Sequence, residues 1–496
     1  MRGALMALAL TYARAQLGVD APLVSVETHV ANGLPAFALV GLPEAAVRES
    51  RERVRASLLT CGYEMPPRRI TVNLAPADLP KEGGRFDLAM ALGLLAATGQ
   101  IPPQSLAGYE FLGELALSGQ LRPVPGVLPA AVRARDAGRA LIVPSENAAE
   151  AARVSGVRVF GAGHLREVVA HLLAADVLGL SEAPQVAVPQ DDLDLRDVRG
   201  QHRAKRALEI AAAGGHNLLM IGPPGAGKSM LAQRFSALLP SMTEAEALES
   251  AAIWSVSTQG FTDAAWGVRP FRAPHHTASA VALIGGGGQP RPGEISLAHH
   301  GVLFLDELPE FDRRALEVLR EPLETGRVVI SRAARQVDFP ASFQLIAAMN
   351  PSPKGDDSDP EAGRRYRARL SGPLLDRIDI QLSLPAVAKE YLRQDAPQDG
   401  EATVTVRARV EQARAVQMAR AGLPNARLGA AILARDARLG AAENALLEQA
   451  MERLNLSARG RDKVLRLART IADLAGVEVI RVEHLAEAMG YRELQW

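Results

Sequence analysis

Apolar and polar residues alternate in short segments over the first 180 residues of the chain. The runs Pro22–Val30 and Arg69–Leu74 are rich in β-branched and apolar side chains, which predicts strands. The segments Glu44–Thr60 and Leu88–Thr98 have the apolar spacing of helices. Strands interleaved with helices predict a mixed α/β domain over residues 1–180.

Two stretches interrupt this pattern and divide the chain. Ser181–Asp192 contains two prolines and no amphipathic period, which is typical of a linker, and we assign residues 181–195 to it. The polar stretch Lys389–Glu401 marks a second boundary. We therefore expect a second domain over residues 196–388 and a second linker over residues 389–405.

The last region, residues 406–496, has a helical period. In Arg461–Leu474, four apolar residues recur at i, i+3, i+4 and i+7: Val464, Leu467, Ala468 and Ile471. One apolar face of this kind predicts a helical C-terminal domain.

A glycine-rich segment separates the predicted strand Asn217–Ile221 from the predicted helix Met230–Leu239. It is a complete phosphate-binding loop, with the residues Gly222, Pro223, Pro224, Gly225, Ala226, Gly227, Lys228 and Ser229. The glycines let backbone N–H groups turn toward phosphates at a helix N-terminus. Lys228 would reach the β- and γ-phosphates, and Ser229 would hold Mg²⁺. The sequence therefore predicts binding of a nucleoside triphosphate.

The apolar run Val302–Glu307 ends in two carboxylates. Asp306 is placed to hold Mg²⁺ through water, and Glu307 to orient or deprotonate the attacking water. Adjacent carboxylates after a strand also occur in solvated turns, but the upstream phosphate loop favours the catalytic interpretation.

A further apolar run, Phe343–Met349, ends at Asn350. An asparagine at a strand end can donate to the γ-phosphate or position the attacking water. Asparagine before proline, here Pro351, is also common in turns, so Asn350 alone is weak evidence for a catalytic site.

The charge balance excludes a general polycation. The chain has 56 basic and 56 acidic residues, so a nucleic-acid partner would need a local basic surface. Only six of the basic residues are lysine, and arginine suits phosphate recognition. A compositional bias of the source genome explains the same excess of arginine.

The subcellular location is indicated by the number of cysteines and by the absence of a long apolar run. The single cysteine, Cys61, excludes an intramolecular disulfide and a cysteine-cluster metal site, which favours a reducing cytoplasm. The N-terminal segment could be mistaken for a signal peptide, but Thr11–Arg14 stands where the cleavage site would lie, so we expect a strand or helix there. No run is long enough to span a membrane, so no membrane association is expected.

The segment Ser371–Ile380 contains a Leu-Leu-Asp-Arg element that ends at Arg377. Together with the phosphate loop, the strand ending in two carboxylates, the strand-end asparagine and a helical C-terminal region, it resembles an AAA+ ATPase. The insertions match the clade shared with magnesium chelatase and the replicative MCM helicases. The resemblance implies ATP and Mg²⁺ as cofactors.

The same resemblance assigns roles to several arginines. It makes Arg377 an arginine finger that acts on the neighbouring subunit, with Arg369 as the alternative. It makes Arg459 the candidate sensor-2 contact to the γ-phosphate, with Arg466 as the alternative, although an exposed helix arginine is equally consistent with a solvated charge. A finger supplied by another subunit implies a ring, and we expect a homo-hexamer.

The interval between Lys228 and Asp306 is much longer than one crossover helix needs. It contains Arg269–Ser279 and the glycine-rich run Gly285–Gly293, which the clade comparison identifies as a hairpin insert directed into the ring pore. Arg272 of this insert is a candidate DNA contact.

Two adjacent histidines, His275 and His276, lie in this insert. They invite a metal hypothesis, but they lack a third ligand nearby and lie in a proline-flanked loop, so we do not expect a metal site.

A second candidate hairpin covers Gly326–Phe339, with Arg332 and Arg335 near its tip. In the clade this hairpin also points to the pore, where arginines can track phosphates without reading sequence. A surface hairpin with solvated arginines is the alternative.

Three N-terminal segments, Pro35–Ser50, Thr71–Leu88 and Leu112–Gly119, form a distinctive set. With them, the chain resembles the bacterial ComM/YifB (magnesium chelatase-like) family over essentially its whole length. The family's fold is an S5/Lon-protease-like α+β N-terminal domain, an AAA+ P-loop three-layer αβα core and an α-helical lid. Arg85 stands near the place of the Lon nucleophile, so proteolysis is not expected.

The resemblance to this family implies a hexameric, DNA-dependent ATPase that acts as a DNA helicase and branch-migration motor in homologous recombination and natural transformation. Single-stranded or branched DNA and recombination proteins are the implied partners. A chelatase-like motor for metal insertion and a non-motor, ATP-gated scaffold are the alternatives.

The chain departs from its relatives after Asn350. Relatives commonly carry a Cys-Pro-Cys-Gly cluster there, whereas this chain has Ser352 and Lys354 in place of the thiols. We therefore expect no zinc.

Overall fold

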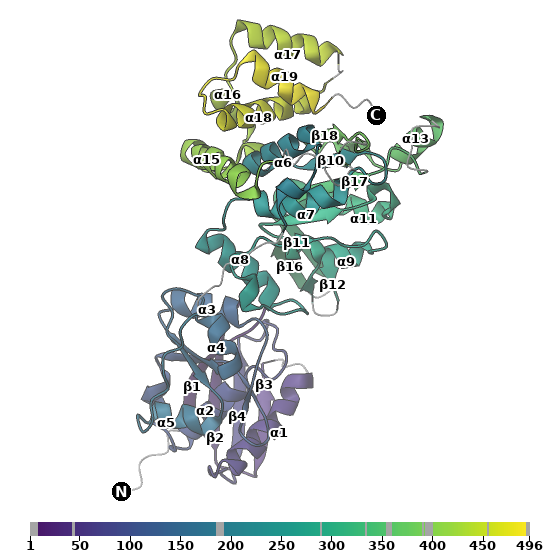
Figure 1. The fold of residues 1–496 in the computed structure, drawn as a ribbon. Coiled ribbons are helices and arrows are strands. Elements are labelled where there is room, and N and C mark those ends of the chain that lie inside the picture. Colours follow the sequence, from purple (N-terminus) through teal and green to yellow (C-terminus); the bar gives the residue numbers. More distant parts are fainter. Residues whose placement is uncertain are drawn as a thin grey trace. The chain divides into compact units, whose positions relative to one another are not determined.

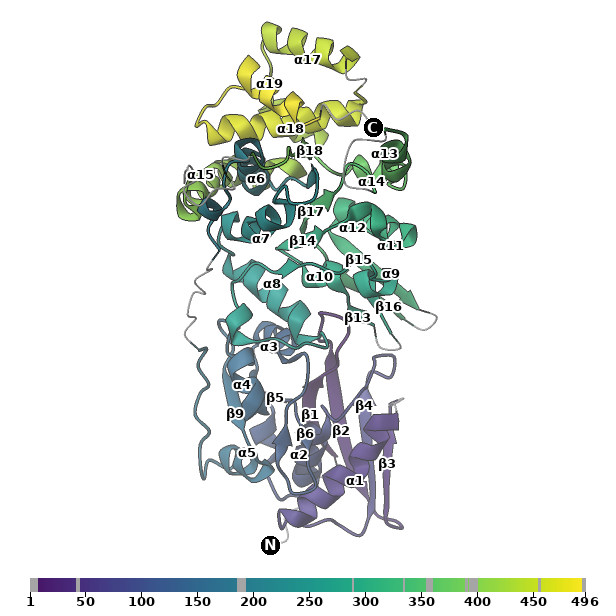
Figure 2. The ribbon, with the colours of Figure 1, turned by 45° about the vertical axis from the view of Figure 1, so that its right-hand side comes forward.

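The computed structural model describes residues 8–41, 45–184, 193–287, 290–332, 335–353, 360–388, 391, 400–453 and 456–492. Contacts divide the chain into two compact units. Unit 1 takes its residues from the ranges 1–187, 247–266 and 333–338, and unit 2 from the ranges 188–246, 267–332 and 339–496. Figures 1 and 2 show both units, with many of their elements labelled.

A four-stranded sheet forms one half of unit 1. Its strands are β1 (Leu8–Arg14), β2 (Leu23–Ala31), β3 (Ala36–Val40) and β4 (Arg69–Ala75), in the order β1-β2-β4-β3. Only β3 and β4 are parallel to each other. Alternate residues of β2 and β4 are buried, as the period-2 pattern predicts. The N-terminal segment that resembles a signal peptide contributes strand β1.

Helix α2 (Asp87–Ala97) packs against β1 and β2, and every one of its residues is buried. Gly93 lies where this helix approaches the sheet, since a Cβ atom there would lie 2.6 Å from Oγ1 of Thr28. Helix α1 (Ala45–Thr60) packs against α2. Both helices lie where the apolar spacing predicts them.

A three-stranded parallel sheet forms the other half of unit 1, in the order β5-β8-β9. Glu110 of β5 is fully buried and accepts hydrogen bonds from Arg14 at 2.6 and 2.7 Å and from Arg139 at 3.1 Å. The remaining elements assigned wholly to this unit are β5 (Tyr109–Phe111), β6 (Glu114–Leu115), β7 (Leu121–Arg122), β8 (Ala140–Pro144), β9 (Val159–Ala162), α3 (Val127–Asp136), α4 (Ser145–Ala151), α5 (Leu165–Leu172) and the 3₁₀ turns Pro103–Leu106 and Asp263–Ala265.

Unit 2 is built on a five-stranded parallel sheet in the order β11-β14-β17-β10-β18. Its strands β10, β14 and β17 are almost wholly apolar and buried, as in parallel sheets that are covered on both faces. The sheet consists of β10 (Leu218–Ile221), β11 (Phe271–Arg272), β14 (Val302–Leu305), β17 (Gln344–Met349) and β18 (Ile380–Ser383). The strands at 217–221, 302–307 and 343–349 were thus predicted to within two residues.

Helices α6 (His202–Gly214) and α7 (Lys228–Leu238) pack against this sheet and against each other. Shorter elements follow: α9 (Ala280–Ile284), β12 (Gly285–Gly286), β13 (Arg291–Pro292), α10 (Glu294–Leu297), α11 (Arg313–Glu317), α12 (Arg320–Thr325), β15 (Arg327–Arg332), α13 (Pro360–Arg367), α14 (Gly372–Leu375) and the 3₁₀ turns Leu195–Asp197 and Leu308–Glu310. Helix α8 (Glu244–Ser255) and strand β16 (Arg335–Pro340) have residues in the ranges of both units.

The C-terminal part of unit 2 is helical, as predicted. It comprises α15 (Thr403–Ala421), a 3₁₀ turn at Asn425–Arg427, α16 (Ala430–Asp436), α17 (Ala441–Arg453), α18 (Ala458–Leu474) and α19 (Val482–Gly490). Val464, Leu467, Ala468 and Ile471 are buried on one face of α18, which packs against α6, α15 and α19. Among the described residues, no helix has the length and apolar character to cross a membrane.

Candidate nucleotide site

The phosphate-binding loop connects β10 to α7 at the carboxyl edge of the parallel sheet. Gly225 and Gly227 have φ angles of 78° and 90°, in the left-handed region that favours glycine. A Cβ atom at either position would have no neighbour within 4 Å, so backbone conformation and not space requires glycine there. Helix α7 begins at Lys228, so its free N–H groups face the loop.

The Lys228 side chain is buried under this loop. Its Nζ donates to the carbonyl oxygens of Gly222 at 2.6 Å and Pro223 at 3.0 Å, and to Oδ1 of Asn350 at 3.0 Å. Burial lowers the pKa of the ammonium group, an effect opposed by the nearby carboxylates of Asp306 and Glu307. The structure therefore brings together Lys228 and the predicted strand-end asparagine.

Ser229 meets the first of the two predicted carboxylates. Its Oγ donates to Oδ2 of Asp306 at 2.6 Å, and Oδ1 of Asp306 accepts the backbone N–H of Glu307 at 2.9 Å. A hydroxyl and a carboxylate at this separation are hard oxygen donors of the kind that Mg²⁺ prefers. The donor set therefore fits the predicted ion.

Glu307 has a different environment. Its φ of 52° is in the left-handed region, which is uncommon for a residue with a side chain. Its Oε2 lies 3.2 Å from Nδ1 of His276, and the two side chains are 51% and 33% exposed. One of the two adjacent histidines thus contacts the predicted catalytic carboxylate.

A pocket of about 430 Å³ lies beside the phosphate loop, lined by Arg199, by residues 201–204 and 382–388 and by Tyr391. Gln201 of this lining donates from Nε2 to the carbonyl oxygens of Ala226 in the loop at 3.1 Å and of Pro385 at 3.0 Å. This amide therefore links the pocket to the loop. This link was not predictable from the sequence, because no short motif contains Gln201.

The two candidates for the arginine finger, Arg377 and Arg369, both have acidic neighbours within the chain. Arg377, whose side chain is 13% exposed, donates to Oε1 of Glu324 at 2.5 Å and to the carbonyl oxygen of Arg320 at 3.0 Å. Arg369, 53% exposed, donates to Oε2 of Glu310 at 2.9 Å. Each guanidinium is therefore paired with a carboxylate of its own chain.

Helix α18 carries the sensor-2 candidates. Arg459 is exposed in its first turn, whereas Arg466 is half-buried and donates to the carbonyl oxygen of Leu428 at 3.0 Å. Between them, Nζ of Lys463 lies 3.1 Å from Oδ1 of Asp379, which directly precedes β18. This buried pair, which sequence reasoning missed, joins the helical region to the sheet.

The DNA-binding candidates have varied surroundings. Arg272 forms a two-pronged ion pair with Glu294, at 2.6 and 2.8 Å. Strands β15 and β16 form a two-stranded sheet, as predicted for the second hairpin. Arg332 ends β15 and Arg335 begins β16, and the positions of their side chains lie outside what the structure describes.

Some predicted features lie outside the described residues. These are most of the two linkers and residues 354–359, which include Lys354 at the place of a missing thiol. Ser352, at the other thiol position, is buried.

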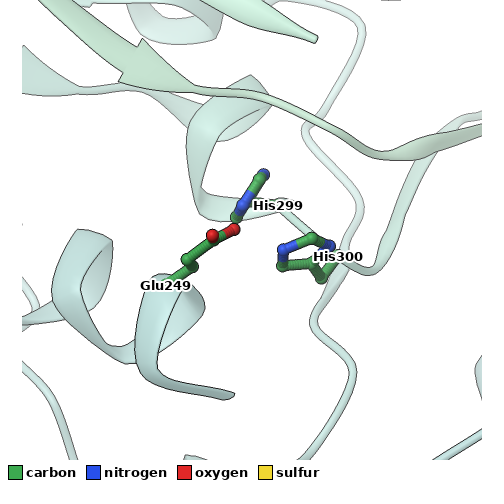
Figure 3. A group of neighbouring side chains, drawn as sticks. All are labelled: Glu249, His299 and His300. Carbon is green, nitrogen blue, oxygen red and sulfur yellow. The ribbon is translucent and has the colours of Figure 1, made fainter. Parts of the chain in front are cut away.

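A second pair of adjacent histidines, His299 and His300, follows α10 (Figure 3). Nδ1 of His299 accepts the backbone N–H of Ser342 at 2.9 Å, and Nδ1 of His300 lies 3.7 Å from Glu246. Glu249, also drawn in Figure 3, belongs to unit 1 and the histidines to unit 2, so we assign no metal site to the group.

Comparisons with known families account for most of the chain. The family described as magnesium chelatase, subunit ChlI, matches residues 194–392. The family described as subunit ChlI of Mg-chelatase matches residues 26–147, and the ChlI C-terminal family matches residues 400–492.

The competence protein ComM of Haemophilus influenzae is 50% identical to the chain over 500 residues, covering 99% of the chain and 98% of ComM. YifB of Salmonella typhimurium is 50% identical over 495 residues, with the same coverage of both chains. The chain belongs to the magnesium chelatase-like ComM/YifB family. The mixed α/β fold, with its parallel sheet and helical C-terminal region, is consistent with the AAA+ fold of this family.

Similarity to a chelatase subunit is more limited. The magnesium-chelatase 67 kDa subunit of Chlorobaculum parvum is 28% identical over 188 residues, which cover 37% of this chain and 25% of that subunit. The ComM/YifB family therefore describes the whole chain, and the chelatase subunit describes only a part of it.

Proposed function

We propose that the chain is a DNA-stimulated ATPase that works as a hexameric branch-migration motor. The observation that carries the proposal is the convergence of Lys228, Ser229, Asp306 and Asn350 at one edge of the parallel sheet. A phosphate loop joined to a carboxylate and a strand-end amide is the arrangement that phosphoryl transfer from ATP requires. The 430 Å³ pocket beside the loop is where we place the nucleobase.

In the proposed reaction Glu307 accepts a proton from water. The water oxygen forms a bond to the γ-phosphorus while the bond from that phosphorus to the ADP oxygen breaks. Lys228 holds the phosphates, and Asn350 orients the γ-phosphate or the attacking water. Bound Mg²⁺, held by Ser229 and Asp306, would neutralise phosphate charge.

The ring is proposed because the family resemblance implies that the arginine finger comes from a neighbouring subunit. Arg377 is our first choice and Arg369 the alternative, with Arg459 or Arg466 as the sensor-2 contact. In the ring, Arg377 would leave Glu324, which lies 2.5 Å away, for the neighbour's γ-phosphate.

DNA is proposed as the substrate of the motor because a relative that matches almost the full length of the chain is named a competence protein. The inserts around Arg272 and at β15–β16 would contact its phosphates.

We propose domains at residues 1–180, 196–388 and 406–496, the first with an S5/Lon-like fold. Arg85 is buried there and donates to the carbonyl oxygen of Pro125 at 2.9 Å, which suits a structural role and not nucleophilic catalysis.

A second candidate is a motor that drives metal insertion into a tetrapyrrole. The observation that favours it is the partial similarity to the Chlorobaculum chelatase subunit. Both candidate motors require ATP hydrolysis, so the ligand that stimulates hydrolysis distinguishes them.

The test is ATP hydrolysis by the full chain, measured alone, with a four-way DNA junction and with a tetrapyrrole. Stimulation by the junction, together with migration of its branch point, is expected. Stimulation by the tetrapyrrole alone would support the chelatase-like motor. Nucleotide binding without turnover under all three conditions would leave only a scaffold and overturn the motor.

A further inference from the structure

Two arginines lie at the amino edge of the parallel sheet of unit 2, the edge at which its strands begin and which is opposite to the phosphate loop. Arg414 of α15 donates to the carbonyl oxygens of Ala212 and Ala213, both at 2.9 Å, at the end of α6 and just before β10. Arg427, in the 3₁₀ turn after α15, donates to Oγ of Ser342, just before β17. Because β10 and β17 are neighbouring strands, the two arginines form a pair at one place on this edge.

The arginine pair, Arg414 and Arg427, has no carboxylate of its own. Within the part of the chain that the structure describes, both guanidinium groups donate only to uncharged oxygens. The carboxylate whose charge reaches both of them is that of Glu246, and it already lies 3.1 Å from Arg269, which precedes β11. The amino edge therefore carries positive charge in excess.

The excess charge makes this surface unfavourable without a ligand. Burial is the main reason that the pKa of Arg414 is lowered to about 10. The positive charges of Arg269 and Arg427 act in the same direction, and Glu246 opposes them. Arg414 is still charged at pH 7, so the guanidinium groups repel one another there. A bound anion would offset this repulsion.

The arginine pair can be reached from solvent. Arg414 is half-buried and Arg427 is exposed. Arg427 donates from Nη2 to Ser342, so most of its five N–H groups are left for water or a ligand. The planar fork of a guanidinium group matches two oxygens of a phosphate group. The surroundings therefore suit a phosphate monoanion.

DNA is the source of phosphate that the charge distribution favours. The chain has equal numbers of basic and acidic residues, so binding of DNA requires a local excess of positive charge. Arg272 of the first insert is neutralised by its ion pair with Glu294, at 2.6 and 2.8 Å. The arginine pair, in contrast, supplies such an excess without first breaking an ion pair.

We propose that Arg414 and Arg427 bind a phosphodiester group of DNA at the amino edge of the sheet, as a contact separate from the two inserts. The proposal rests on DNA as the partner of the proposed motor and adds a second place at which its backbone is held. Contacts with phosphates carry no sequence information, so the site binds DNA of any sequence. Because the site lies opposite to the phosphate loop, it affects the affinity for DNA and not the chemistry of hydrolysis.

The experiment measures the binding of a fluorescein-labelled four-way DNA junction to the full chain, by anisotropy, over a range of salt concentrations. Each phosphate contact contributes about 0.9 to the steepness of log K against log salt concentration. Arg427→Gln keeps an amide donor and loses the charge, so it should reduce the steepness by about 0.9 and weaken binding about fivefold to tenfold at 0.1 M salt. Arg414→Gln should have the same effect, and the double variant about twice the change in steepness. DNA-free ATP hydrolysis should remain unchanged in all three.

Two further variants separate charge from structure. Arg427→Lys keeps the charge and should retain the steepness of the unchanged chain. Arg435→Gln is the matched control, because Arg435 is exposed in the same helical region but lies 2.6 Å from Asp436, and it should leave the salt dependence unchanged.

A salt dependence that is the same in the unchanged chain, Arg414→Gln and Arg427→Gln would overturn the proposal. A loss of steepness that Arg427→Lys shares would also overturn it, because the arginine would then have a structural role. If the variants change only the size of the DNA-free assembly in light scattering, the arginine pair binds carboxylates of a second copy and not DNA. Failure of the proposed motor alone gives a different result, since the unchanged chain would bind the junction without faster ATP hydrolysis. The salt dependence of the variants would still decide the proposal.

Discussion

The ammonium group of Lys228 lies 3.0 Å from the side-chain oxygen of Asn350, so the phosphate loop after β10 is bonded to the end of the neighbouring strand β17. The same ammonium donates to two carbonyl oxygens of its own loop. The amide oxygen and the two carbonyl oxygens thus accept from all three donors of the ammonium group, so the phosphates of ATP would compete with them for Lys228. Nucleotide binding would replace these bonds and free the amide of Asn350 for the γ-phosphate or the attacking water.

Replacement of Asn350 by alanine is therefore expected to impair the chemical step more than binding. Removal of one donor that acts in the transition state costs about 10²-fold to 10³-fold in kcat. The affinity for ATP should change by less than about fivefold, because Lys228 keeps its place under the loop. Steady-state kinetics and titration with a fluorescent ATP analogue measure the two effects. An equal loss in both would assign Asn350 a structural role.

Conversion of Asp306 and of Glu307 into the corresponding amides should affect ATP binding and hydrolysis differently. Glu307→Gln removes the proposed general base, so hydrolysis should fall by at least about 10²-fold while ATP binding persists. Asp306→Asn removes a charged oxygen beside Ser229, so binding itself should weaken and should lose its dependence on Mg²⁺. Binding measured with Mg²⁺ and with a chelator distinguishes the two variants. Identical behaviour of both would contradict the division of roles.

The finger assignment predicts complementation between inactive subunits. Arg377→Ala should bind ATP normally and hydrolyse it at least about 10³-fold more slowly, as expected for loss of a finger. A mixture of Arg377→Ala and Lys228→Ala subunits should regain part of the activity, because interfaces then form that carry one intact loop and one intact arginine. Arg369→Ala is the matched control and should retain most activity. The reverse ranking would make Arg369 the finger, and a mixture without activity would count against action between subunits.

The sequence predicted those parts of the site in which chemistry demands a fixed local motif. The loop glycines, Asp306 and Glu307 follow strands whose apolar runs end at the same edge of a parallel sheet, so a linear pattern is enough to place them. Contacts between side chains that are distant in the sequence were not predictable. Nothing in the sequence indicates that His276 meets Glu307 or that Arg272 is paired with Glu294.

In the fold, too, local features were predictable from the sequence and contacts between distant residues were not. Helix α18 was predicted from its apolar face, since burial of that face needs only the period of the helix. Its polar anchoring was not predicted, because lysine and arginine are abundant on exposed helix faces and a buried partner is known only after folding. Lys463 is such a residue, and its pairing with Asp379 leads to the last prediction.

The carboxyl group of Asp379 is largely buried, with the side chain 13% exposed, and lies 3.1 Å from Lys463 Nζ and 3.5 Å from His216 Nδ1. Burial would raise its pKa, but the neighbouring Lys463 and His216 overcome that effect and hold the pKa below its ordinary value. Asp379→Asn leaves the ammonium of Lys463 largely buried without the carboxylate that contacts it directly. Loss of one member of a buried pair costs about 3–5 kcal/mol, so the variant should unfold at a clearly lower temperature and urea concentration.

The sign of the pH dependence follows from the lowered pKa of Asp379. A carboxyl group whose pKa is lower in the folded than in the unfolded chain contributes stability above the unfolded pKa, near 3.9, and loses it as the pH falls through the folded pKa. The difference in stability between the unchanged chain and Asp379→Asn should therefore be full at pH 7 and shrink below about pH 4. Asp462→Asn, which removes an exposed partner of Arg461, is the control and should change stability by less than about 0.5 kcal/mol. A stability difference for Asp379→Asn that is independent of pH would show that the cost comes from packing and not from the charge pair.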